Sequence, residues 1–76
     1  MRLISVNRQP DESYWGRSST NNDACVLKPG AFERLVAAGT LQLMQGETRQ
    51  YEGDVPPEDI DGCFGVWDVP LDNFLV

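Results

Sequence analysis

Proline and glycine interrupt this chain so often that it can form only short elements. The 76 residues contain five prolines and seven glycines, spread over most of their length. Both residue types favour turns and disfavour the interior of helices and strands. A hydrophobic content of 41% supplies enough apolar side chains for a core, so disorder is not expected. We therefore expect residues 1–76 to form a single small globular domain with many turns.

Short alternating segments predict strands in both halves of the chain. The predicted strands are residues 2–7, 13–16, 24–27, 40–45, 48–52 and 63–69. The fourth and fifth are joined by Gly46-Glu47, and glycine at the first position of a two-residue loop favours a tight hairpin turn. Residues 18–23 are a polar loop, and residues 56–60 can form one helical turn.

One segment has helical periodicity, from Pro29 to Ala38. Phe32, Leu35 and Val36 recur at a spacing that places them on one helix face, and Gly39 can end the helix in the left-handed conformation. A helix this short must pack on a sheet to be stable. The fold class predicted is α+β, a small mainly antiparallel sheet of four to five short strands with one helix at about 29–38 on one face.

The charges are distributed unevenly along the sequence. Residues 1–51 contain all six bases and five acids, whereas residues 52–76 contain seven acids and no base. These seven acids are the candidate binding residues, Glu52, Asp54, Glu58, Asp59, Asp61, Asp68 and Asp72. Apolar residues run through the same segment, so we expect its acids to lie on a folded surface. A surface of one sign attracts partners of the opposite charge.

The residue types present give little support to catalysis. The chain has no histidine, which removes the commonest general base and metal ligand. Two cysteines are too few for a structural zinc site, and no glycine-rich phosphate loop occurs. Asp59 and Asp61, two residues apart, would lie ~6.6 Å apart on one side of an extended chain, near the carboxylate spacing of glycosidases. An acidic solvated loop explains them better, so we expect no enzyme activity, no metal and no cofactor.

Three functional interpretations remain. The favoured one is a non-enzymatic module that binds another protein with a basic surface, as an inhibitor of a nucleic-acid-handling complex of the kind encoded by phages and other mobile elements. The first alternative is a structural or assembly subunit whose acidity serves solubility and whose apolar tail, Phe74 to Val76, forms a homodimer. The second alternative is a small carboxylate-based enzyme. Direct binding to nucleic acid or to a membrane is disfavoured by the negative charge.

The cysteines and the chain start bear on the compartment. The first residues lack the apolar region of a secretion signal, and no apolar run approaches the length that spans a bilayer, so we expect a cytoplasmic protein. In a reducing compartment Cys25 and Cys63 would be free buried thiols. A disulfide between them is the alternative, since both lie in apolar, strand-like segments.

Overall fold

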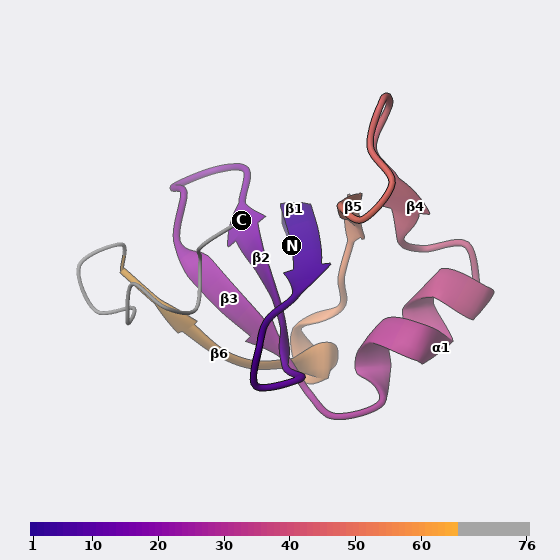
Figure 1. Cartoon of the computed structure of the whole chain (residues 1–76). Helices are drawn as coiled ribbons and strands as arrows, with labels where there is room; N and C mark the ends of the chain where they lie inside the picture. Colours follow the sequence, from indigo (N-terminus) through magenta and orange to yellow (C-terminus); the bar gives the residue numbers. More distant parts are fainter. Residues whose placement is uncertain (66–76) are drawn as a thin grey trace.

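A computed structural model of the chain describes residues 1–65 (Figure 1). This part contains six strands, one α-helix and one 3-10 turn. The elements are β1 (Arg2–Arg8), β2 (Tyr14–Ser18), β3 (Ala24–Leu27), α1 (Ala31–Ala37), β4 (Gln42–Leu43), β5 (Tyr51–Asp54), η1 (Pro57–Asp59) and β6 (Ile60–Phe64). The α+β class is confirmed, although the sheet has six strands rather than the four to five predicted.

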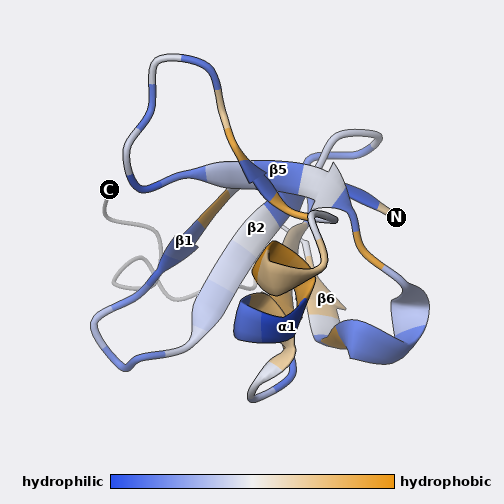
Figure 2. Cartoon of the chain, turned by 90° about the vertical axis from the view of Figure 1, so that its right-hand side faces the viewer, coloured by the Kyte–Doolittle hydropathy of each residue, from blue (hydrophilic) through white to orange (hydrophobic). Residues whose placement is uncertain are grey.

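All six strands form one antiparallel sheet in the order β4-β5-β1-β2-β3-β6. The consecutive strands β1, β2 and β3 make its centre, and later strands add to both sides. Helix α1 follows β3 and lies over one face of the sheet, as predicted (Figure 2). The buried core between helix and sheet consists of Leu3, Val6, Cys25, Leu27, Ala31, Leu35, Leu41 and Val55.

A bulge in β1 decides which of its side chains reach the core. Leu3 and Val6 are both fully buried although they are three residues apart, a spacing that a regular strand would place on opposite faces. The pairing of β1 with β5 shifts register between Leu3 and Val6, and its pairing with β2 shifts between Ile4 and Asn7. Ser5, inside both intervals, has a positive φ of 53°. The extra residue turns Val6 inward and leaves Ile4 half-buried.

The helix is shorter than predicted but ends as expected. It begins at Ala31, after Gly30 rather than at Pro29, because Gly30 has a φ of 81° that is not helical. At the other end the Gly39 N–H donates to Val36 O at 3.0 Å and the Thr40 N–H to Leu35 O at 2.9 Å. Gly39 has a φ of 80°, so it closes the helix in the left-handed conformation.

The predicted hairpin is present, but the prediction of a two-residue loop is wrong. Strand pairing ends at Leu43 and Tyr51, which leaves residues 44–50 as a loop that projects from the sheet (Figure 1). Gly46 has a φ of 81° and is the third residue of a turn closed by the Glu47 N–H and the Met44 carbonyl at 3.0 Å. Gly46 therefore occupies the third position of the turn, whereas the sequence pattern placed it at the second, the first position of the loop.

The last described strand starts earlier than predicted. Ile60 already pairs with Leu27, immediately after η1, which confirms the short helical turn expected at residues 56–60. The predicted strand at 63–69 overlaps β6 only at its start. Gly65 follows β6 outside any strand, and residues 66–69 and the tail Phe74 to Val76 lie outside the described residues.

Candidate protein-binding site

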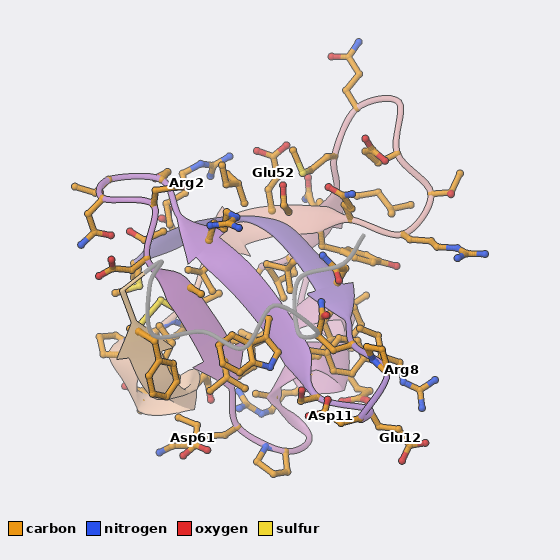
Figure 3. All side chains as sticks on the ribbon, turned by 60° about the vertical axis from the view of Figure 1, so that its left-hand side comes forward. Arg2, Arg8, Asp11, Glu12, Glu52 and Asp61 are labelled. Atoms are coloured by element: carbon orange, nitrogen blue, oxygen red, sulfur yellow. A yellow bond between two sulfur atoms is a disulfide. The ribbon has the colours of Figure 1, made fainter. Side chains whose placement is uncertain are left out.

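The acids predicted to form one surface are separated in the fold. Glu52 and Asp54 lie on β5, whereas Asp61 lies on β6, and the strands β1, β2 and β3 stand between them in the sheet. Figure 3 shows Glu52 and Asp61 on opposite sides of the molecule. Glu58 is exposed on η1. Asp68 and Asp72 lie outside the described residues, so the candidate surface divides into at least two parts.

Asp59 does not belong to an exposed surface. Its side chain is buried, with the residue only 6% exposed, and both carboxylate oxygens accept hydrogen bonds from the Arg34 guanidinium of α1. Hydrogen bonding to Asp59 and the negative charge of Asp59 raise the pKa of Arg34 above its ordinary value. The predicted placement of Asp59 and Asp61 on one side is wrong, because Asp59 belongs to a 3-10 turn and faces the helix while Asp61 is exposed.

The two acids of β5 do share one side of their strand, as predicted. They border a depression of about 540 Å³, which we call the β5 groove. The groove combines residues of β1, β4 and β5 with the segment that follows α1. Its lining residues are Arg2, Gly39, Thr40, Gln42, Leu43, Glu52, Gly53 and Asp54.

The charges of the β5 groove are only partly balanced. The Arg2 guanidinium forms an ion pair with the Glu52 carboxylate, and the two side chains meet above the sheet (Figure 3). Arg2 is also the cross-strand partner of Asp54, which is exposed. One base and two acids line the groove, so its lining has a net charge of −1. Leu43 adds an apolar wall, 49% exposed.

The groove exists because the backbone after α1, at Thr40, lies very close to β5 at Gly53. A Cβ atom on Gly53 would overlap the Thr40 carbonyl oxygen and would lie 2.9 Å from the carbonyl carbon. Both are backbone atoms and cannot rotate away. Glycine is therefore required by this contact, and it lets the Thr40 and Gln42 region lie directly against β5.

A second depression was not anticipated from the sequence. It has a volume of about 350 Å³ and lies between the start of β2 and the start of α1. Three acids from the first half of the chain, Asp11, Glu12 and Glu33, line it together with Lys28. Their positions in the sequence gave no sign of this clustering, because Glu12 and Glu33 are 21 residues apart and only the fold brings them together.

Asp11 in this depression has a perturbed acidity. Its carboxylate accepts hydrogen bonds from the Ser13 hydroxyl and from the Ser13 N–H, the latter at 3.0 Å. These bonds favour the charged form and hold the pKa of Asp11 below its ordinary value. The Ser13 hydroxyl oxygen in turn accepts the Trp15 indole N–H at 2.9 Å. Asp11 is therefore a fixed acceptor at the start of β2.

Cys25 and Cys63 form a disulfide, so the free-thiol interpretation does not hold. The two residues are direct cross-strand partners on β3 and β6, with Cα atoms 4.1 Å apart. The yellow bond beside β6 in Figure 3 marks this link. It fastens β6, the outermost strand on this side among residues 1–65, to β3 across 38 positions of sequence.

Two further kinds of feature, clusters of the commonest metal ligands and membrane-spanning helices, are absent from the described part of the chain. Within residues 1–65, no three or more histidine, cysteine, aspartate or glutamate side chains gather as a metal ion would require. None of the helices there has the length and apolar character to cross a bilayer. No protein-family model matches the chain, and comparison with curated proteins and with solved structures gave no significant match.

Proposed function

We propose that this protein is a non-enzymatic module that binds another protein through its acidic surface, with the β5 groove as the docking point for a basic side chain. The observation that carries the proposal is the composition of the groove. Arg2 forms its ion pair with Glu52, so the Asp54 carboxylate stays available to a ligand. Thr40 and Gln42 supply polar atoms in the same groove. Leu43 offers an apolar surface for the aliphatic stem of an arginine or a lysine.

Three acids and one base line the second depression, but the Glu12 carboxylate there already pairs with Arg8, so we favour the β5 groove as the cation site. Lys28 lines the second depression and is exposed, so it would repel an approaching base. In the β5 groove the positive charge of Arg2 is held by Glu52. An exposed ion pair of this kind contributes about 0–1 kcal/mol, so an incoming guanidinium can compete for Glu52 as well as binding Asp54.

In this proposal the partner is a protein whose basic surface otherwise binds nucleic acid, and the chain inhibits it by occupying that surface. Support comes from exposed acids on several elements, among them Glu33, Glu47, Asp54, Glu58 and Asp61. Fixed negative charges on a folded surface accelerate association with a basic partner and make binding weaken as salt rises. Capture of partners from the natural host should therefore fall with salt and with added competitor DNA.

The location of the site is tested by nuclear magnetic resonance with a short arginine-rich peptide as the probe. Titration into the ¹⁵N-labelled oxidised chain at low salt should shift the amide signals of Thr40, Gln42, Leu43, Gly53 and Asp54 most. Shifts centred instead on residues 11–14 and 28–33 would place binding in the second depression and contradict the proposal. Uniform small shifts over all exposed acids would show non-specific attraction and would contradict it equally.

A further inference from the structure

Three sulfur atoms from distant parts of the sequence meet beside the β3–β6 pair. The Met1 Sδ atom lies 3.6 Å from Cys25 Sγ and 4.0 Å from Cys63 Sγ. Sulfurs joined in a disulfide carry no hydrogen, so these are contacts and not hydrogen bonds. The site draws its members from the chain start, from β3 and from β6, and the charged groups of the β5 groove take no part in it.

The backbone holds all three residues in place independently of the disulfide. The Met1 ammonium donates to Val55 O at 3.0 Å, and the Val55 N–H donates to Met1 O at 2.7 Å. These two bonds continue the β1–β5 pairing to the first residue. On the other side, the pairs flanking Cys25 and Cys63 in the β3–β6 ladder keep the two cysteines opposite each other.

We propose that the reduced protein binds one Cu(I) ion through Cys25, Cys63 and Met1. Reduction by two thiols of the glutathione class yields two cysteine thiols and one disulfide of the reductant. Binding of Cu⁺ then releases both thiol protons, and the Met1 thioether donates a lone pair as the third ligand. Thiolate and thioether sulfur are the soft ligands that select Cu(I).

The sulfur positions fit a trigonal metal site. A thiolate lies about 2.3 Å from a d¹⁰ metal ion such as zinc, so three sulfurs around one ion in a plane stand ~4.0 Å apart. The two Met1 contacts, at 3.6 and 4.0 Å, already have nearly this spacing. Only the pair of cysteine sulfurs must separate, which reduction allows.

The surroundings also favour Cu(I) over zinc. Structural zinc takes four ligands, usually cysteine and histidine, and the chain has no histidine and no third cysteine. Cys25 is fully buried, which keeps water from one side of the site, whereas Cys63 is exposed and provides access for the ion. Sequence spacing alone missed the site because the third ligand is a methionine 24 residues away from the nearer cysteine.

The test is anaerobic Cu(I) competition against a coloured chelator, using the full chain reduced with a phosphine that is then removed. One equivalent of Cu(I) should bind, and X-ray absorption should show three sulfurs at about 2.3 Å. Met1→Leu, made by ligating a synthetic peptide 1–24 to residues 25–76 at Cys25, should weaken Cu(I) binding about tenfold or more. The matched control is Met44→Leu, since Met44 is the other methionine and its Sδ accepts the Ser5 N–H at 3.3 Å.

Circular dichroism accompanies each titration, because loss of a disulfide generally destabilises a small domain. If reduction unfolds the chain, Cu(I) should restore the native spectrum in the wild type and in Met44→Leu, and fail to do so in Met1→Leu. Equal Cu(I) affinity of the wild type and Met1→Leu would overturn the three-sulfur site. Binding that survives in the Cys25→Ser, Cys63→Ser double variant would overturn it as well.

Discussion

Gly53 is the residue on which the β5 groove most depends. Gly53→Ala places a methyl group against the Thr40 backbone, which must move to make room. We expect a loss of about 1–3 kcal/mol in the free energy of unfolding, the usual cost of forcing an extra carbon into a packed contact. Urea unfolding of the oxidised protein, followed by tryptophan fluorescence, measures this loss.

Gly62→Ala is the matched control, because Gly62 is also a strand glycine. Its nearest neighbours would be Phe64 ring atoms at 3.4 and 3.5 Å, which are ordinary contact distances. This variant should be as stable as the wild type or slightly more so, since alanine reduces the freedom of the unfolded chain. If both alanine variants lose the same stability, the close contact at Thr40 is not the cause.

Asp59 is structural rather than a docking residue. Asp59→Asn removes the charge that binds Arg34 across α1 and η1, and it should cost about 1–3 kcal/mol of unfolding free energy, the usual range for a buried group that loses its partner. Asp61→Asn removes the same charge from an exposed position and should change stability by less than ~0.5 kcal/mol. Thermal unfolding of the two variants at equal ionic strength compares them. Equal midpoints would show that the Arg34 pair contributes nothing.

Asp11 gives the fold a defined response to acid. Its pKa is lowered in the folded state from an ordinary value of 3.8, mainly by the Ser13 hydroxyl. The resulting stabilisation is therefore fully present above pH 3.8 and is lost as the pH falls through the lower folded value. Carboxyl titration by nuclear magnetic resonance should show the Asp11 pKa rising towards 3.8 in Ser13→Ala. An unchanged Asp11 pKa in that variant would contradict the assignment.

At the scale of elements, aromatic contacts attach the helix to the sheet. The Phe32 ring stacks on Tyr14 at 3.9 Å between centroids and meets the edge of Tyr51 at 5.0 Å. Phe32→Ala should destabilise the protein by about 2–4 kcal/mol, near the lower end for phenylalanine truncation because the ring is half-buried. Glu33→Ala, on the exposed side of the same helix, is the control. Chemical denaturation of both variants tests whether Phe32 anchors α1.

The sequence predicted an element well where its structure depends only on residues close to one another in the chain. The strand at 24–27 and the glycine at the end of α1 follow from local chemistry and are confirmed. The bulge at Ser5 and the longer loop at 44–50 depend on neighbouring strands. Met44, for example, accepts the Ser5 N–H through its sulfur, a contact between residues 39 positions apart. Such a contact leaves no periodicity in the sequence.

In the whole molecule as far as residue 65, folding mixes charges that are separate along the sequence. The acidic segment contributes Glu52 to an ion pair with Arg2 and buries Asp59 against Arg34, so bases from the first half neutralise part of it. Meanwhile Asp11 and Glu33, from the more balanced half, gather beside β2. The presence of acids on a folded frame was predictable. Their grouping was not, because the order of the strands and the packing of α1 and η1 on the sheet decide which of them become neighbours.

Binding of a basic side chain in the β5 groove depends on Asp54 in our proposal, and charge variants of nearly equal size separate this site from general attraction. Calorimetry with the arginine-rich peptide at low salt should show weaker binding for Asp54→Asn than for Glu47→Gln, an exposed acid of the neighbouring loop. Arg2→Gln, which frees Glu52, should bind the peptide more tightly than the wild type. Equal affinities for Asp54→Asn and Glu47→Gln, or weaker binding by Arg2→Gln, would contradict a groove-specific site.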